Sequence, residues 1–437
     1  MTAPSLSMDK CQINRSAQKL FIYCFLAYTC SYIGRKNFSA CLPAMITDGL
    51  LTKSIGGYIT TAYMICYGAG QLISGLVGSR VKPRFMIGIG LAGASICNFA
   101  MGLSASATIL PIIWAANGLF HSMLWSPIVR VFTDLLPASH RERAGTNISV
   151  SCSVGAVLAF LLPAWILRVS HWRVVFFVSG SLLLATLFIW IIGHRFLRTY
   201  IHMMEEACSA ERRMMREKAE EQATLKHHKL KHSLPALLIV SGLWMALFSL
   251  VCNGALRDAL ESWAPTFLAD QFSLNGSMAA LISVVIPIIS VTGTYFSNWL
   301  HSKFIHNEIY TVGVMFLIAC GCILGLYAVR EINALLCAIF MAVSVSAMWG
   351  ANHMFLTVIP YHFAVWGMSS PITGFLNSVI YFATAICSGL YGILAENIGW
   401  KILILVWLGI GFAGIIFSIL GGKLWAKKRN ISLEEIS

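Results

Sequence analysis

Charge is scarce in this sequence, and catalytic motifs are missing from it. Only 11% of the 437 residues are charged, and 18 acidic residues stand against 31 lysines and arginines. There is no P-loop, no nucleophile motif and no cluster of metal ligands, which argues against an ATP-driven pump, a membrane enzyme and a bound cofactor. The 13 cysteines include no C-x-x-C pair, so we expect them to be small packing residues.

Long apolar runs take the place of charge. The chain is 57% hydrophobic with a mean hydropathy of +0.74, and many of its apolar runs approach the ~20 residues that cross a bilayer as a helix. We therefore predict an all-α membrane protein with twelve transmembrane helices. The predicted spans are Leu20–Met45, Ile55–Leu76, Phe85–Leu103, Ile109–Val131, Gly145–Val169, Val174–Ile192, Pro235–Leu268, Met278–Leu300, Tyr310–Ala328, Ile332–Phe355, Pro371–Ala395 and Ile402–Gly421.

The basic residues predict the orientation of the chain. With the N-terminus inside, cytoplasmic segments hold 22 of the 31 lysines and arginines and outer loops hold five, as the positive-inside rule requires. We expect a protein of the inner (plasma) membrane with both termini in the cytoplasm and no cleaved signal peptide. The net charge of +13 then reflects topology and attraction to anionic lipid, and nothing indicates nucleic-acid binding.

One polar segment divides the chain into two halves. His194 to His232 is rich in charge and in helix formers, and we expect it to be a cytoplasmic tether. The predicted divisions are an N-terminal tail (1–19), a six-helix bundle (20–193), the linker (194–233), a second six-helix bundle (234–422) and a C-terminal tail (423–437).

Two arginines occupy matching places in otherwise apolar stretches of the two halves. Arg35 precedes Pro43 by eight residues, and Arg257 precedes Pro265 by eight residues. A charge at membrane depth costs at least ~2.5 kcal/mol, so each guanidinium is expected to face a partner or a water-filled path. Each arginine lies about eleven residues, or ~16 Å, from the outer end of its helix, near the middle of the bilayer. The pair predicts one central anion site.

Two motifs around these arginines resemble those of a known family. The segment Tyr32–Pro43, read YIGRKNFSACLP, resembles the first-helix motif of the organophosphate:phosphate antiporters, which include glycerol-3-phosphate and hexose-6-phosphate carriers of the major facilitator superfamily. Leu256-Arg257 followed by Trp263–Leu268 resembles the partner motif, and Gly75–Arg84 resembles a loop of the superfamily. The resemblance implies the major facilitator fold, with two pseudo-symmetric bundles and alternating access to a central site.

The resemblance also implies roles for individual residues. Arg35 and Arg257 would clamp a phosphoryl group from opposite bundles, because a guanidinium stays protonated and bonds two phosphate oxygens at once. Tyr28, Tyr32 and Tyr381 would close the site and bond the ligand. The competing interpretation is that each arginine pairs with an internal carboxylate and only ties helices together.

Lys36 follows Arg35 as it does in the family, but other positions depart from the pattern. Lys36 points roughly 100° away from Arg35, so it either touches the phosphate, faces a neighbouring helix or raises the positive potential. Gln71 stands where a lysine is expected, and Asp258 and Glu261 follow Arg257. We therefore expect a less positive cavity than in the best-known family members.

The acidic pair leaves two interpretations open. Asp258 either pairs with a neighbouring cation as an internal gate or helix tie, or carries a proton. For the organic part of the ligand the candidates are His121, Trp349, Asn352 and Asn377. At the cytoplasmic end, Arg130 and Asp134 together with Arg80 and Arg84 are predicted to form a gate of ion pairs that changes between states.

The predicted function is secondary transport. We expect import of a sugar or polyol phosphate in exchange for inorganic phosphate, by a chain that is not an enzyme, acts as a monomer in the lipid bilayer and needs no cofactor. The alternatives are a proton-coupled organic-anion symporter that uses Asp258 or Glu261, and a transporter-like membrane sensor of sugar phosphates.

Overall fold

The computed structural model describes residues 9–77, 81–208, 238–239, 241–363 and 369–428. These residues are mostly helical and contain no strand. The predicted linker therefore falls mostly outside the described residues, as do Arg80 of the predicted gate and the last residues of the C-terminal tail.

In the first half of the chain, each predicted span coincides with one helix of the described residues, and a further helical stretch, 198–208, follows them. The helices that coincide with the spans are α1 (Lys10–Thr47), α2 (Lys53–Val77), α3 (Pro83–Leu103), α4 (Leu110–Leu135), α5 (Ala138–Val169) and α6 (Trp172–Phe196).

The second half adds six more helical rods within the described residues, again one for each predicted span. Two of these rods are built from several pieces, with a π-helical turn (η1 or η2) near one end. They are α9 (Leu243–Gln271); α10 (Gly276–Ser283), α11 (Val285–Leu300) and η1 (His301–Ile305); α12 (Glu308–Val329); α13 (Ala334–His353), η2 (Met354–Val358) and α14 (Ile359–Tyr361); α15 (Ser369–Asn397); and α16 (Trp400–Lys428).

The seventh predicted span is longer than the helix that the structure describes there. Its predicted start, Pro235, lies outside the described residues, and α9 begins at Leu243, directly after Gly242. Gly242 has φ 75°, a left-handed conformation that costs a glycine little and interrupts the helical path. Apolar composition alone does not reveal such a break.

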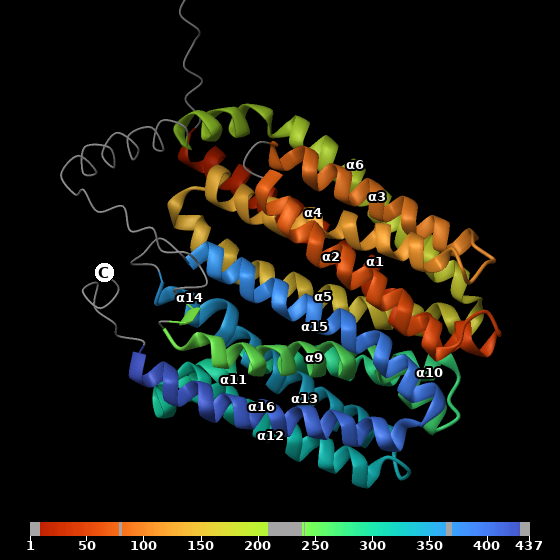
Figure 1. The fold of residues 1–437 in the computed structure, drawn as a ribbon. Helices are drawn as coiled ribbons and strands as arrows, with labels where there is room; N and C mark the ends of the chain where they lie inside the picture. Colours follow the sequence, from red (N-terminus) through yellow and green to blue (C-terminus); the bar gives the residue numbers. More distant parts are fainter. Residues whose placement is uncertain (1–8, 78–80, 209–237, 240, 364–368, 429–437) are drawn as a thin grey trace, which may run out of the picture.

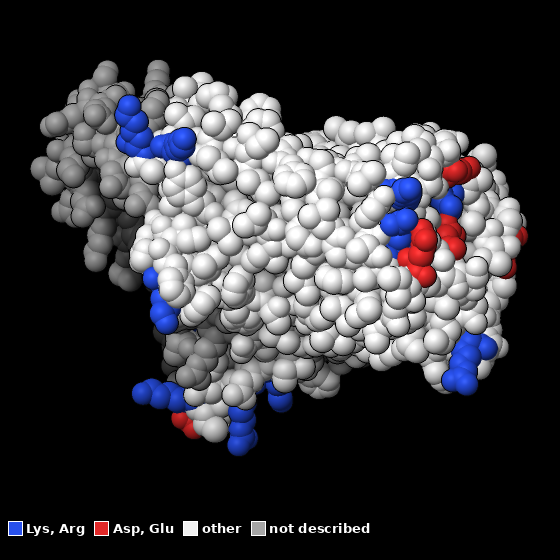
Figure 2. All heavy atoms as spheres, turned by 90° about the horizontal axis from the view of Figure 1, so that it is seen from below, with Lys and Arg blue, Asp and Glu red and all other residues white. Residues whose placement is uncertain are grey.

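Length and composition suit nine of the described helices to crossing a membrane. The rods that fall short of this criterion are α1, α2 and α4. All three supply polar or charged side chains to the centre of the molecule, and α1 holds both Arg35 and Lys36. In the view of Figure 2 the charged side chains lie toward the two ends, and a broad uncharged band separates them.

The two halves form two bundles that meet along their length (Figure 1). In the first half α1 packs on α5 and α6, and α4 packs on α2 and α3. In the second half α9 packs on α15 and α16, and α12 packs on α13 and α16. The bundles touch chiefly where α2 meets α15, α1 meets α9 and α5 meets α10.

The described chain begins and ends at one end of the molecule, which we call the termini end (Figure 1). At the opposite end, the far end, polar contacts join the halves. Lys53 Nζ lies 2.5 Å from Asp270 Oδ2, and the backbone N–H of Ser54 donates to Glu396 at 2.7 Å. A Cβ added to Gly57 would lie 2.9 Å from the carbonyl oxygen of Ser388, so α2 and α15 approach closely there. The far end is therefore sealed in this conformation.

Candidate functional site

Arg35 lies against aromatic rings. Its Cζ is 4.8 Å from the ring centroid of Tyr32 and 4.9 Å from that of Tyr67. Within the described residues no carboxylate comes within 4 Å of this guanidinium, and Arg35 donates no hydrogen bond. Ring faces stabilise a cation without neutralising it, so the N–H donors of Arg35 stay available for an anion.

Arg257, in contrast, is held by polar partners. Its two terminal nitrogens donate to Asp258 Oδ2 at 2.8 Å and to Asn352 Oδ1 at 2.9 Å, and its Cζ lies 4.7 Å from the ring of Trp349. The side chain is buried, and its Nε has no hydrogen-bond partner. One donor of the second arginine therefore remains unused inside the protein.

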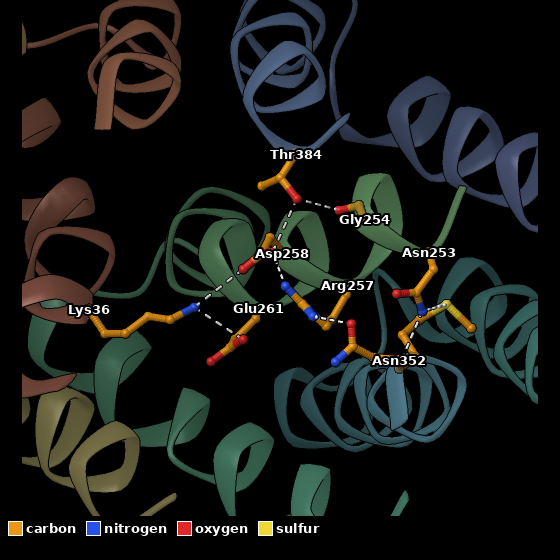
Figure 3. Close-up of polar contacts among 9 residues, drawn as sticks. Lys36, Asn253, Gly254, Arg257, Asp258, Glu261, Asn352 and Thr384 are labelled. Carbon is orange, nitrogen blue, oxygen red and sulfur yellow. Dashed lines mark hydrogen bonds and ion pairs between the residues drawn. The ribbon is translucent and has the colours of Figure 1, made fainter. Parts of the chain in front are cut away.

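Lys36 connects the bundles beside the two arginines. It reaches from α1 to α9, where its Nζ lies 3.1 Å from Glu261 Oε2 and 3.7 Å from Asp258 Oδ1 (Figure 3). All three side chains are buried. Lys36 thus faces a neighbouring helix, which was one of the orientations expected from its position after Arg35.

The two carboxylates have unequal surroundings. Asp258 accepts hydrogen bonds from Arg257 and, at 3.2 Å, from the hydroxyl of Thr384, besides its ion pair with Lys36. Glu261 has only the ion pair of its Oε2 with Lys36 among the described residues. Asp258 is therefore fixed in place, whereas Glu261 depends on one lysine.

Tyrosines from both bundles surround Arg35. Tyr28 and Tyr32 pack edge to face at 5.4 Å, and Tyr67 meets Tyr381 of α15 at 4.8 Å. Gln71 donates to the hydroxyl of Tyr67 at 3.0 Å. These contacts carry the aromatic shell from α1 through α2 to α15, so it links the two bundles.

Sequence reasoning missed Tyr63 and Tyr67. Both lie on α2, their rings stack at 5.9 Å, and the hydroxyl of Tyr63 is buried without a partner. Their spacing of four, continued by Gln71, places all three on one helical face. This spacing in the sequence could have identified Tyr63 and Tyr67 as candidate site residues. Tyr63 also lines a small cavity with Arg35, Lys36, Trp114 and Ser262.

The remaining candidates for the organic part of a ligand are placed unequally. His121 Nδ1 lies 2.9 Å from the carbonyl oxygen of Asn117, and its ring stands 6.3 Å from that of Tyr63. Trp349 and Asn352 contact Arg257, as described above. Asn377 is half-buried on α15 and makes no polar contact with either arginine among the described residues.

The predicted gate residues at the termini end are only partly described. Arg130 Nε donates to Asp134 Oδ2 at 3.1 Å, and its NH1 donates to the carbonyl oxygen of Val81 at 3.0 Å. The guanidinium of Arg84 lies 4.5 Å from the ring of Phe85. These contacts stay within the first bundle. The gating role of this group remains a prediction.

The family follows from a comparison with known protein families. The model described as Major Facilitator Superfamily matches residues 24–369. The chain belongs to the major facilitator superfamily. It is accordingly a multi-pass membrane transporter and not an enzyme.

Curated relatives agree with the resemblance read from the arginine motifs. A probable hexose phosphate transport protein of Chlamydia muridarum is 22% identical over 435 residues, which cover 91% of this chain and 89% of that protein. A glycerol-3-phosphate transporter of Bacillus subtilis is 24% identical over 306 residues, covering 68% of each. The resemblance to the organophosphate:phosphate antiporter family is thereby confirmed.

A solved structure confirms the predicted fold. The crystal structure of a bacterial homologue of the human lysosomal transporter Spinster matches with a TM-score of 0.72, at 15% identity, over 96% of this chain and 99% of that one. The likeness concerns the arrangement of helices.

Proposed function

We propose that this transporter imports a phosphorylated small metabolite, a sugar or polyol phosphate, in exchange for inorganic phosphate. Arg35 and Arg257 bind the phosphoryl group from opposite bundles near the middle of the membrane. The chain acts as a monomer in the inner membrane, with both termini in the cytoplasm.

The observation that carries this proposal is the pair of arginines with unused donors. Arg35 has no carboxylate partner among the described residues, and Nε of Arg257 has no acceptor. Lys36 and Asp258, their immediate neighbours in sequence, form an ion pair, so the two guanidinium groups belong to one site. Planar guanidinium donors match the geometry of phosphate oxygens.

Exchange follows from the cost of an empty site. Without an anion, Arg35 keeps an unpaired charge in a half-buried, aromatic setting. Moving such a charge through a closed, desolvated state costs more than moving it with an anion bound. The bundles therefore change conformation faster when loaded, and phosphate on one side drives uptake from the other.

Proton-coupled symport is the second candidate, and one observation favours it. Glu261 is buried, and Lys36 is the sole partner of its carboxylate among the described residues. Once Lys36 moves away, this carboxylate is suited to take up a proton. In this alternative a proton, and not an outgoing phosphate, accompanies the substrate.

Counterflow in liposomes tests the proposal. Purified protein is reconstituted into vesicles with or without internal phosphate, and uptake of labelled phosphate and of glycerol 3-phosphate is measured. We expect uptake at least tenfold faster into loaded vesicles. Equal uptake into empty vesicles under an imposed pH gradient indicates symport, and binding without any uptake indicates a sensor.

A further inference from the structure

The charges of the central site do not match a doubly charged substrate. Of the described residues, three cations (Arg35, Lys36 and Arg257) and two carboxylates (Asp258 and Glu261) meet there, which leaves one net positive charge. A phosphate monoester carries about −1.5 to −2 at neutral pH. Bound alone it leaves an uncompensated negative charge in a buried site, which is costly. A substrate of net charge −1 balances the site.

The two carboxylates respond differently to an incoming anion. Lys36 is adjacent to Arg35 on α1, so a phosphoryl group at Arg35 attracts the lysine and weakens its hold on α9. Asp258 then still accepts hydrogen bonds from Arg257, at 2.8 Å, and from Thr384, at 3.2 Å. Glu261 keeps no such partner, because Lys36 is its sole ion-pair partner among the described residues.

A buried carboxylate that loses its counter-ion needs another one. Glu261 follows Arg257 by four residues on α9, a rise of about 6 Å along the helix axis. Figure 3 shows the Glu261 side chain between Lys36 and Arg257. A cationic group two or three carbons from a phosphate bound at the arginines therefore reaches Glu261.

Resting on the function proposed above, we propose that the site prefers, among short phosphate monoesters, one whose organic part carries an ammonium group, and that Glu261 receives this ammonium. Such a zwitterionic ester has the net charge of −1 that the site balances. The same carboxylate weakens the binding of a dianionic ester that offers only hydroxyl groups.

A matched pair of ligands tests the proposal. 2-Aminoethyl phosphate and 2-hydroxyethyl phosphate have nearly the same size, and they differ in one ammonium in place of one hydroxyl. Affinities for the purified wild-type protein are measured by calorimetry at pH 7, with inorganic phosphate as reference. We expect 2-aminoethyl phosphate to bind at least tenfold more tightly than 2-hydroxyethyl phosphate. Equal binding, or tighter binding of the hydroxyl ester, overturns the proposal.

A phosphodiester separates net charge from the ammonium contact. Methyl 2-hydroxyethyl phosphate also carries a single negative charge but has no cationic group. We expect it to bind more weakly than 2-aminoethyl phosphate. If it binds equally well, the site selects net charge alone, and the assignment of Glu261 is wrong.

Variants locate the effect at Glu261. Glu261→Gln should bring the two esters to within about threefold of each other, mainly by improving binding of the hydroxyl ester. Glu261→Asp keeps the charge and should retain the preference in reduced form, which guards against a folding defect of the glutamine variant. The control is Glu331→Gln, which changes an exposed loop carboxylate and should keep the wild-type ratio. A wild-type ratio in Glu261→Gln refutes the assignment.

Failure of the proposed function looks different from failure of this inference. If neither ester nor inorganic phosphate binds, the phosphate site itself is wrong. If the phosphates bind and the ammonium brings no advantage, the phosphate site stands and the role of Glu261 falls.

Discussion

Lys36 of α1 and Glu261 of α9 join the two bundles across 3.1 Å inside the protein. Because the partners lie on different bundles, we expect this ion pair to break when the far end opens. Lys36 is also the direct neighbour of Arg35. We therefore expect a substrate anion and the closure of the far end to act on the same lysine, which would couple binding to the change of conformation.

Replacing either arginine by lysine should abolish tight phosphate binding. Arg35→Lys and Arg257→Lys keep the positive charge but lose the planar fork that bonds two oxygens. We expect at least a hundredfold loss of affinity, about 2.8 kcal/mol at 1.4 kcal/mol per factor of ten. Calorimetric titration with inorganic phosphate measures it.

The matched control is Arg168→Lys, at an exposed position near the end of α5. It should bind phosphate as the wild type does. Near-normal phosphate affinity in either site variant contradicts the clamp.

Asp258→Asn should strengthen binding of inorganic phosphate. The carboxylate of Asp258 occupies one donor of Arg257 and pairs with Lys36, so it competes with an incoming anion. The amide has nearly the same volume and no charge, and the net charge of the site rises by one. We expect a several-fold lower dissociation constant, measured by calorimetry beside Glu331→Gln.

This variant also separates the two carboxylates. Asp258→Asn should retain a preference for 2-aminoethyl phosphate, because Glu261 is still present, but in reduced form, because the site then carries two net positive charges. Weaker phosphate binding would mean that Asp258 chiefly orients Arg257, and that it does not compete with the ligand.

The sequence pointed to the charged residues at the centre of the candidate site because buried charge is costly enough to stand out. Arg35, Arg257, Asp258 and Glu261 are conspicuous in apolar runs, and the structure brings Lys36 to both carboxylates. The spans were predictable for the same reason, since apolar length is a strong signal.

The rest of the site depends on contacts between distant segments. Thr384 bonds Asp258 across 126 positions, and Tyr67 meets Tyr381 across the boundary between the bundles. Tyrosine and threonine are common in membrane helices, so the presence of these residue types does not mark a position as part of the site. Which face of α2 looks toward α15 is decided by the packing of whole bundles, which no local pattern records.

Close helix packing predicts a glycine that cannot be replaced. A Cβ added to Gly293 of α11 would overlap the backbone carbonyl oxygen of Ser346 on α13, whereas a Cβ at Gly321 of α12 would meet nothing within 4 Å. Gly293→Ala should lower the free energy of unfolding by about 1–3 kcal/mol, because the helices must separate. Gly321→Ala should be neutral or slightly stabilising.

Thermal unfolding in detergent compares the two alanine variants. Equal midpoints would show that α11 and α13 can separate at this point without cost.

The seal at the far end should control how often that end opens. Lys53 pairs with Asp270, and the indole N–H of Trp400 donates to the same carboxylate at 3.0 Å. Lys53→Gln removes an ion pair worth about 1 kcal/mol at a partly exposed position, which corresponds to roughly a fivefold larger open population. Hydrogen exchange of the peptides that cover the start of α2 and the end of α15 should rise accordingly.

Lys401→Gln, at an exposed lysine on the same end, should leave exchange unchanged, because this lysine holds no partner across the bundles among the described residues. Identical exchange in the two variants would mean that the close approach of Gly57 to α15, and not the ion pair, keeps the far end shut.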